Sequence, residues 1–400
     1  MRQSPGAAVV LGALGPGGAE RIMVRLACLL SRHMPIDIVV PSPQPDAMKG
    51  SIDPGVTLVE LEAGHYYGAL RLFNKIFKTK DILLFPWACV VFVWKLCASA
   101  WALRGYIRRT RPRALLTAHY DTITIIANYL AGRPSKVIVT GHTMLSEHLA
   151  RQPSPVRYCF SWMCRLFYPL ADRVVGVSKA VMQDVIENFR VPASRATYIY
   201  NPVVGPALAV QSEEACRHPW IGCGVPVLAS VARLSPEKDI MTLLDAFALL
   251  REERECRLLV LGDGPDRDAL VSRARELGID EDIDWLGMVS DPSPYVRGAD
   301  VMVLSTFYEG LPTVLIEALF VGTTPVASDA PGGIRELLDD GRYGYLAPVH
   351  DPRALAAAIL EALDRPIAED VLKARAEAFS EDEGVGAYLS LLHDLEAIDP

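Results

Sequence analysis

Short apolar runs alternate with Gly-containing loops and amphipathic stretches along the chain, and this pattern occurs in both halves. In the first half, residues 7–14 predict a strand, a Gly-rich turn follows, and residues 19–33 repeat apolar positions at helical spacing. The further predicted strands are DIVV, TLVEL, ALLTA, KVIVTG and RVVGVS, then PVLASVA, CRLLVLG, IDWLG, DVMVLS and TPVAS in the second half. Strands that alternate with helices predict parallel sheets covered by helices on both faces.

The two runs predict two domains of the α/β class, each a doubly wound parallel sheet of the Rossmann type. Asn201–Pro202 is a turn signal that ends the preceding strand, so we place the domain junction there. The predicted domains are 1–203 and 204–380. The tail 381–400 has apolar positions at helical period, and we expect this helix to pack back on the first domain.

Composition narrows the class of protein. The chain has 400 residues, of which 50% are apolar and 22% charged, so it has material for packed cores and is unlike a disordered chain. The eight cysteines form no CxxC pair and no His/Cys group at zinc spacing. This favours buried, free thiols in a reducing compartment over a disulfide framework.

Charge is divided unevenly along the chain. Residues 1–200 carry 24 Lys/Arg against 12 Asp/Glu, and residues 201–400 carry 16 against 36, which gives the net charge of −8. A basic first half fits a domain that meets something anionic. The excess is greatest between positions 71 and 113, where ten cations stand against Asp81. They are Arg71, Lys75, Lys78, Lys80, Lys95, Arg104, Arg108, Arg109, Arg111 and Arg113.

The same basic segment is also apolar. Residues 82–94 carry no charge, but Pro86 and Lys95 interrupt the run and argue against a membrane-spanning helix, which needs about 20 apolar residues. Three tryptophans recur every seven residues, on one face of a helix, at Trp87, Trp94 and Trp101. Trp beside cations is typical of a lipid–water interface, and a buried core helix with basic flanks is the alternative.

The strongest candidate for chemistry lies after the strand DVMVLS. Glu309 follows this strand, and Pro312 is a suitable first residue for the next helix, so Glu309 stays in a loop at the carboxyl edge of the sheet. The amides of Gly310 and Leu311 then stand at a helix N-terminus, which suits an anion. Glu317, two turns into the helix, can reach sugar or ribose hydroxyls. The alternative is that both glutamates are ordinary solvated surface residues, and this would be the better interpretation if only one of Glu309 and Glu317 were present.

Three further loops follow predicted strands. Arg233 and Lys238 flank the loop after PVLASVA, where two cations suit a diphosphate, although an isolated pair at this spacing is usually a surface feature. Gly262 and Gly264 permit a tight turn after CRLLVLG. The Gly pair in SDAPGGIREL allows close backbone approach at the start of another helix.

Together, these motifs resemble the retaining glycosyltransferases of family GT4, which have the GT-B fold of two Rossmann-like domains facing each other across a cleft. The likeness is dense from 226 to 348 and sparser from 8 to 203. The segments that carry it are LGPGGAE, VTGHT, GVSKAV, IYNPV, VARLSPEKD, LGDGP, WLGMV, GADVMVLSTFYEGLPTVLIEAL and ASDAPGGIREL.

The resemblance implies roles in binding a nucleotide-sugar donor. Arg233 and Lys238 would hold the diphosphate and stabilise the charge on the leaving group. Glu317 would bind the ribose, and Glu309 the donor sugar beside the Gly310 and Leu311 amides. The loop at Met288 and Val289 would meet the base through its backbone. Further donor contacts implied by the resemblance are Gly17 and Gly18 of the first Gly-rich loop and Gly262 of the turn after CRLLVLG.

The first domain would bind the acceptor. His142, in VTGHT, matches the family's active-site histidine, and His119, in LLTAHYD, is a second and weaker candidate. Net retention of the anomeric configuration is the family's outcome, by attack on the same face that the phosphate leaves. No Asp-x-Asp stands at a strand end in a convincing setting, and DEDID at 280–284 resembles a solvated loop, so we expect no cofactor and no essential divalent metal.

The basic and apolar segment suggests the acceptor. We expect peripheral attachment to an anionic membrane surface, at the cytoplasmic face, and a lipid-linked acceptor such as a polyprenyl-diphosphate saccharide or another anionic glycolipid. UDP is the more frequent donor nucleotide among the enzymes that the chain resembles, so the resemblance implies UDP-hexose or UDP-N-acetylhexosamine as the donor. The segment GGAERIM is similar to family members that build surface polysaccharides and lipid-linked oligosaccharides, which implies a role in surface polysaccharide or glycolipid biosynthesis.

Three other functions compete with this hypothesis. A Rossmann oxidoreductase would need GxGxxG and an acidic residue after the second strand, and neither is present. A nucleotide-sugar epimerase of the same architecture would need acids in the cleft and no basic apolar segment. A non-catalytic nucleotide-sugar-binding homologue would not need to retain Arg233, Lys238, Glu309 and Glu317. Nucleic-acid binding is disfavoured because aliphatic and Trp residues interleave the cations.

Overall fold

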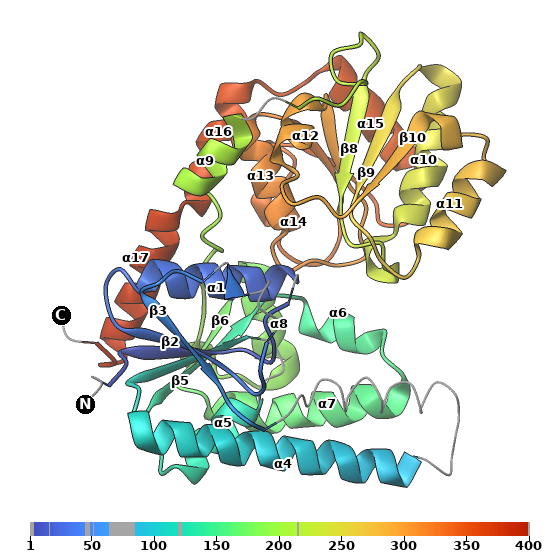
Figure 1. The fold of residues 1–400 in the computed structure, drawn as a ribbon. Helices are drawn as coiled ribbons and strands as arrows, with labels where there is room; N and C mark the ends of the chain where they lie inside the picture. The colour runs from blue at the N-terminus through green and yellow to red at the C-terminus, as the bar shows by residue number, and fades with distance from the viewer. Residues whose placement is uncertain are drawn as a thin grey trace. The chain divides into compact units, whose positions relative to one another are not determined.

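The computed structural model describes residues 4–15, 17–44, 49–50, 52–63, 85–118, 122–213 and 216–398, with side chains except at 85–90, 92, 154–156 and 212–213. The chain forms two compact units, Met1–Ile199 with Gly384–Pro400, and Tyr200–Glu383. Each unit is built on one parallel sheet with helices on both faces (Figure 1). The predicted fold class, two doubly wound α/β domains, is therefore confirmed.

The first unit contains a seven-stranded parallel sheet in the order β3-β2-β1-β4-β5-β6-β7. Strand β1 pairs with β2 on one side and with β4, the central strand, on the other, so that Ala7 lies opposite both Ile36 and Ala114. Its strands are β1 (Ala7–Val10), β2 (Ile36–Val40), β3 (Val56–Glu60), β4 (Ala114–Ala118), β5 (Lys136–Gly141), β6 (Arg173–Gly176) and β7 (Ala196–Tyr198). The strand predicted over 7–14 is thus shorter than expected, because the chain leaves the sheet after Val10.

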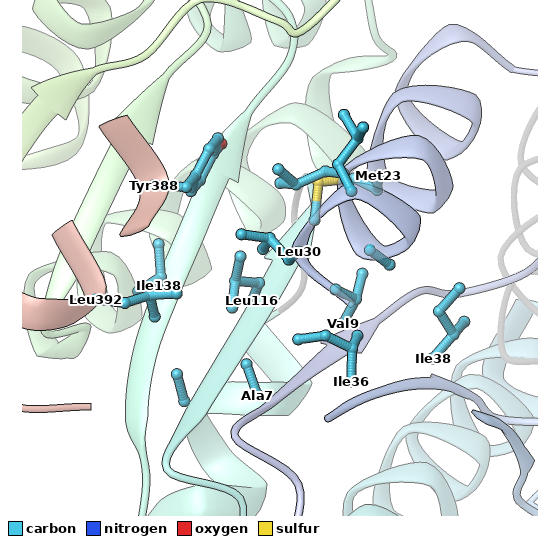
Figure 2. Packing of buried hydrophobic residues seen from close by; sticks show 14 of the residues in the cluster. Ala7, Val9, Met23, Leu30, Ile36, Ile38, Leu116, Ile138, Tyr388 and Leu392 are labelled. Atoms are coloured by element: carbon cyan, nitrogen blue, oxygen red, sulfur yellow. The ribbon is translucent and has the colours of Figure 1, made fainter. Parts of the chain in front are cut away.

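Two hydrophobic cores sandwich this sheet. On one face, α1 (Gly18–Leu30) packs against β1 and β2 through Met23 and Leu30 (Figure 2). On the other face lie the helices that supply Tyr106, Cys164 and Phe189 to the second core. These helices are α4 (Phe85–Thr110), α5 (Thr122–Leu130), α7 (Ser154–Phe167) and α8 (Lys179–Phe189), and α6 (Leu145–Ala150) precedes α7.

The last helix, α17 (Glu381–Asp394), closes the core of the first unit. Tyr388 and Leu392 lie in the same cluster as Ile138 and Leu116 of the sheet, and Figure 2 shows them beside these strands. The chain therefore leaves the first unit after Ile199 and re-enters it at Gly384. We predicted a junction after residue 203 and a returning helix from 381.

The second unit has a six-stranded parallel sheet in the order β10-β9-β8-β11-β12-β13. Its strands are β8 (Val227–Val231), β9 (Arg257–Leu261), β10 (Ile283–Gly287), β11 (Val301–Leu304), β12 (Thr324–Ser328) and β13 (Tyr345–Ala347). Its helices are α9 (Pro206–Glu213), α10 (Ile240–Glu253), α11 (Arg267–Glu276), α12 (Ser293–Gly298), α13 (Thr313–Val321), α14 (Ile334–Leu337), α15 (Pro352–Asp364) and α16 (Glu369–Ala376).

The sequence led us to predict two features, the exposure of the cysteine side chains and the length of the apolar helices. No disulfide joins the cysteines within the described residues, but Cys97, Cys159 and Cys223 are exposed, so the expectation of buried thiols is wrong for these three. Cys97 and Cys159 lie on helix faces turned away from the core, which apolar flanking sequence does not reveal. No helix in the described part of the chain is long and apolar enough to cross a bilayer.

Candidate functional site

The candidate site lies at the carboxyl edge of the sheet in the second unit. Strand β8 pairs with β9 on one side and with β11 on the other, so the strand order reverses between β8 and β11. In open α/β sheets, ligands bind outside the carboxyl ends of the strands at such a switch point. The loops that follow β8 and β11 carry Arg233, Lys238 and Glu309.

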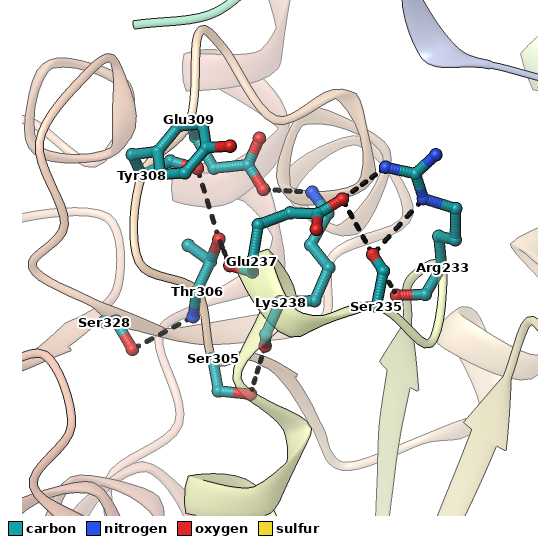
Figure 3. A network of polar contacts seen from close by, with 9 residues as sticks. All are labelled: Arg233, Ser235, Glu237, Lys238, Ser305, Thr306, Tyr308, Glu309 and Ser328. Atoms are coloured by element: carbon teal, nitrogen blue, oxygen red, sulfur yellow. Dashed lines mark hydrogen bonds and ion pairs between the residues drawn. The ribbon is translucent and has the colours of Figure 1, made fainter. Parts of the chain in front are cut away.

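The loop after β8, residues 232–239, is called the cation loop here. It ends in a single 3₁₀ turn, η3 (Pro236–Lys238), and in Asp239, which has a left-handed φ of 44° and caps α10. Thr242 donates from Oγ1 to the Asp239 carboxylate at 2.8 Å, which holds this conformation. The tight turn brings the side chains at both ends of the loop to the same edge of the sheet (Figure 3).

Arg233 is held by groups of its own loop. Its Nε donates to Ser235 Oγ at 3.2 Å, and its Nη2 forms an ion pair with Glu237. Ser235 Oγ also donates to Glu237 Oε1 at 2.7 Å. Partial burial raises the pKa of Glu237, but the hydrogen bonds from Ser235, its own amide and Arg233 outweigh it, so the net pKa is lowered. Glu237 is therefore ionised at neutral pH and positions a guanidinium that remains 69% exposed.

Lys238 and Glu309 meet across the two loops. Lys238 Nζ forms an ion pair with Glu309 Oε1, and the two side chains are 22% and 13% exposed (Figure 3). An ammonium group has three donors, so Lys238 can retain Glu309 and still donate to a bound anion. The pair thus places a cation and a carboxylate next to each other at the switch point.

Two buried hydroxyls join the cation loop to the loop after β11. Ser305 Oγ donates to the Lys238 carbonyl at 3.1 Å, and Thr306 Oγ1 lies 3.0 Å from the Glu237 carbonyl. The Phe307 amide donates to that same Glu237 carbonyl at 2.9 Å. Ser305 and Thr306 are both fully buried. No sequence pattern identifies these two residues or Glu237, because their partners are backbone carbonyls and a neighbouring side chain that only the fold brings close.

The segment after Glu309 leads into α13. The Glu309 amide donates to the Pro331 carbonyl at 3.0 Å, which ties this loop to the loop after β12. Gly310 and Leu311 are buried, Pro312 is the N-cap, and α13 begins at Thr313, one residue later than predicted. Glu317 is half-buried inside α13.

Two glycines let the loop after β9 pack on the backbone of the cation loop. A Cβ at Gly262, whose φ is +133°, would lie 1.9 Å from the Ala232 carbonyl oxygen. A Cβ at Gly264 would lie 2.1 Å from the Leu234 carbonyl oxygen. Backbone contacts below 3.0 Å are not tolerated, so both positions require glycine. The predicted turn after β9 therefore supports the cation loop directly.

The loop after β10 is open to solvent. Met288 is 67% exposed and Val289 is partly buried. Gly287, which precedes them, has a φ of +67° and accepts a hydrogen bond from the Gly262 amide at 2.7 Å. The structure thus places the predicted base-binding loop beside the loop after β9.

The candidates in the first unit follow strands at its carboxyl edge. Gly17 is the N-cap of α1, Gly18 is its first residue, and His142 directly follows β5. Thr140 Oγ1 lies 3.0 Å from both the Thr117 carbonyl and His142 Nε2. Because the carbonyl only accepts, the hydroxyl donates to it and receives a hydrogen bond from Nε2–H of His142. His119 lies outside the described residues.

The basic segment of the first unit is described only in part. Trp94 and Trp101 on α4 are 62% and 64% exposed, so the prediction that they share an outer helix face agrees with their positions. Lys95 and Arg104 each lie over a Trp ring, and Arg108 and Arg109 are exposed at the end of α4. The candidates outside the described residues or side chains are Arg71, Lys75, Lys78, Lys80 and Trp87.

The structure therefore brings together three of the predicted donor residues, Arg233, Lys238 and Glu309. The turn at Gly262 packs on the backbone of the cation loop that carries the first two. Glu317 lies in α13, two turns from this cluster along the chain, and Met288 and Val289 lie on the other side of β9. Among the described residues, no three His, Cys, Asp or Glu side chains are grouped so that they could hold a metal ion.

Two protein-family models match this chain, one in each half. The family model "Glycosyltransferase Family 4" matches residues 16–204, and "Glycosyl transferases group 1" matches residues 222–379, so together they span most of the chain. An N-acetylgalactosaminyltransferase from Campylobacter jejuni that acts on N-acetylgalactosamine-N,N'-diacetylbacillosaminyl-diphospho-undecaprenol is 24% identical over 93% of this chain and 94% of that protein.

Solved structures share the fold over almost the whole chain. Anabaena HepE in complex with UDP-glucose has a TM-score of 0.72 at 17% identity and covers 98% of this chain and 100% of that one. The lipopolysaccharide outer core galactosyltransferase WaaB has a TM-score of 0.68 at 17% identity, over 97% of this chain and 99% of that one.

Proposed function

Since the chain belongs to the glycosyltransferases of family 4, with the GT-B fold, we propose that it moves a hexose or N-acetylhexosamine from a UDP-linked donor to a lipid-linked or polysaccharide-precursor acceptor. We propose further that the anomeric configuration is retained and that the reaction takes place at the cytoplasmic face of a membrane. Surface polysaccharide or glycolipid biosynthesis is the corresponding process.

One observation carries the donor half of this proposal: the loops after β8 and β11 meet at the switch point and join two cations to a carboxylate. Arg233 presents an exposed guanidinium that Glu237 orients, and guanidinium binds phosphate oxygens in pairs. Lys238 is only 22% exposed, so its charge is weakly screened by water. Glu309 can accept hydrogen bonds from sugar hydroxyls while it holds Lys238.

The proposed chemistry assigns these groups to the leaving diphosphate. The bond from the anomeric carbon to the phosphate oxygen breaks, and the bond to the acceptor oxygen forms on the same face. The acceptor proton passes to a leaving phosphate oxygen. Arg233 and Lys238 stabilise the charge that develops there, which is worth several kcal/mol when water is excluded. The reaction then needs no divalent metal, and full activity in excess EDTA is the expected result.

Relatives support the donor and acceptor classes. HepE binds UDP-glucose, and the Campylobacter jejuni enzyme acts on a diphospho-undecaprenol-linked saccharide. Resemblance to the family adds His142 and the Gly17–Gly18 turn as groups that serve the acceptor and the diphosphate. The glycosyltransferase assignment excludes the oxidoreductase hypothesis.

A thermal-shift panel tests the donor. The protein is heated with nucleoside diphosphates and nucleotide sugars of each base, and we expect UDP compounds alone to raise the melting temperature. Lys238→Met should abolish the shift. Lys373→Met, which removes a paired lysine on α16 of the same unit, should keep it. Stabilisation by GDP compounds, or an unaltered shift in Lys238→Met, would contradict the assignment.

Retention is tested on the product. The purified product is examined by proton NMR, and the coupling constant of its anomeric proton is compared with that of the donor. The same configuration in both is expected, and inversion would overturn the proposed same-face attack.

A further inference from the structure

Exposed aromatic and aliphatic side chains gather on three helices of the first unit. Among the described residues, 14 large apolar side chains are exposed, and nine of them lie on α4, α5, α7 or the 3₁₀ turn η1 (Tyr168–Leu170) that follows α7. Single exposed apolar residues are normal, but such a concentration marks an interaction surface. We call it the α4–α7 surface.

Helix α7 contributes a stripe that no sequence motif singled out. Tyr158, Trp162 and Leu166 stand four residues apart and are 65%, 64% and 46% exposed, and Leu170 of η1 continues the spacing. Residues four apart lie on one helical face. On the opposite side, Cys164 is completely buried in the core. The helix therefore shows the pattern of a surface helix whose outward face is apolar.

Helix α4 carries a matching stripe. Trp94 and Trp101 are exposed on one face, while Leu103 and Tyr106 are buried in the core on the other. The helix has 26 residues, so its outer face is long.

The two stripes belong to one layer. Helices α4, α5 and α7 all pack on the same face of the sheet through the same core, and Figure 1 shows α5 beside α4. Arg104 of α4 donates from Nε to the Leu130 carbonyl at the end of α5, at 2.9 Å. Helices that cover one sheet face turn their outer sides in the same general direction. The tryptophans of α4 and α7 are therefore available to one flat partner.

Charge identifies the partner. Helices α4 and α7 contain six Lys or Arg and no Asp or Glu. The cations stand next to the exposed rings: Lys95 over Trp94, Arg104 over Trp101 and Arg157 over Tyr158, at 4.9, 4.5 and 4.8 Å. A partner of this surface must therefore contact exposed aromatic rings and neutralise the positive charges beside them. No acidic side chain on these two helices balances the cations, so the partner is anionic, and Trp and Tyr beside Lys and Arg suit the headgroup region of an anionic bilayer.

We propose that the α4–α7 surface docks on an anionic lipid bilayer, with Trp162 and Tyr158 of α7 inserting beside the tryptophans of α4. This inference rests on the proposed function, because docking brings the enzyme to a lipid-linked acceptor. It adds a second helix, outside segment 71–113, to the membrane contact. Removing a cation costs about fivefold in membrane affinity, and removing a deeply inserted Trp costs about tenfold or more.

Vesicle binding tests the docking surface. Full-length protein is mixed with vesicles of phosphatidylcholine alone or with phosphatidylglycerol, and partitioning is measured by flotation at low salt. Wild-type protein should float only with the anionic vesicles. The double variant Tyr158→Ala/Trp162→Ala should lose at least tenfold in partitioning. A matched control, Met241→Ala/Val371→Ala, removes exposed apolar side chains of the second unit and should bind as wild type does.

The outcomes separate this inference from the proposed function. UDP-dependent thermal shifts of the α7 variant should equal those of wild type, which also shows that the variant folds. Failure of wild type to bind anionic vesicles, with the UDP shift intact, overturns the docking surface alone. Vesicle binding without any UDP shift overturns the donor assignment alone. If the α7 variant instead abolishes a concentration-dependent dimer in ultracentrifugation while wild type ignores vesicles, the surface is a dimer interface.

Discussion

Replacing Lys238 by Met removes the ammonium group while keeping most of the length of the side chain, and it leaves the Glu309 carboxylate without its partner across the two loops. Breaking a fully buried pair costs about 3–5 kcal/mol. The side chains of Lys238 and Glu309 are 22% and 13% exposed, so water still solvates the remaining carboxylate. We therefore expect a loss of about 2 kcal/mol of unfolding free energy, which in a unit of this size lowers the melting temperature by about 6 °C.

A double-mutant cycle measures whether this loss belongs to the pair. Lys238→Met, Glu309→Gln and the double variant are unfolded in urea and followed by circular dichroism. The double variant should lose about 1–2 kcal/mol less than the sum of the single variants, because the second change removes the stranded group. UDP titration by calorimetry should show at least tenfold weaker binding for Lys238→Met. Free energies that add within about 0.5 kcal/mol, with UDP affinity unchanged, would refute both roles of Lys238.

Three other changes probe the support of the site. Gly264→Ala should lower the free energy of unfolding by about 2 kcal/mol or more, since its Cβ would lie 2.1 Å from the Leu234 carbonyl oxygen. Gly386→Ala is the control, because a Cβ there meets nothing within 4 Å, and urea unfolding compares the two variants. Thr306→Val should lower the free energy of unfolding by about 1 kcal/mol and weaken UDP binding in calorimetry, and Thr306→Ser should restore both. Equal stability and UDP affinity in Thr306→Val and wild type would show that the hydroxyl near the Glu237 carbonyl is dispensable. The lowered pKa of Glu237 means that its stabilising effect is present above its ordinary value of 4.5 and is lost as pH falls through its folded pKa. Urea midpoints of wild type and Glu237→Gln should therefore converge below about pH 4.5, and a constant difference down to pH 3 would contradict this.

The two parallel sheets could be predicted because every second-unit strand from β8 to β12 is a short apolar run that ends at a turn signal. Strand β13 was missed, since Tyr345–Ala347 is only three residues long and its pattern resembles a loop. The start of α13 was predicted within one residue because Pro312 directly precedes its first residue, Thr313. Local rules suffice where a signal and its structural effect lie close together in the chain.

The candidate site was predictable only as far as charge and spacing reveal it. Arg233, Lys238 and Glu309 stand at strand ends, which periodicity identifies. The contributions of Ser305 and Thr306 depend on carbonyl groups some 67 to 69 residues away, and no sequence pattern specifies such partners. The stripe of Trp162 on α7 was missed for a similar reason, because an amphipathic helix in sequence is equally compatible with a covered and an uncovered face.

The return of α17 to the first unit has a consequence for biosynthesis. Tyr388, Leu391 and Leu392 belong to the core around β1 and α1, so that core lacks part of its packing until α17 has been translated. The second unit, Tyr200–Glu383, is continuous and can finish folding earlier. At about 5–20 residues per second, the ribosome needs roughly 10–40 s to make the stretch between Ile199 and Gly384. During that interval the amino-terminal half lacks the side chains of Tyr388, Leu391 and Leu392 in its core, and a chain truncated before residue 384 would lack them permanently.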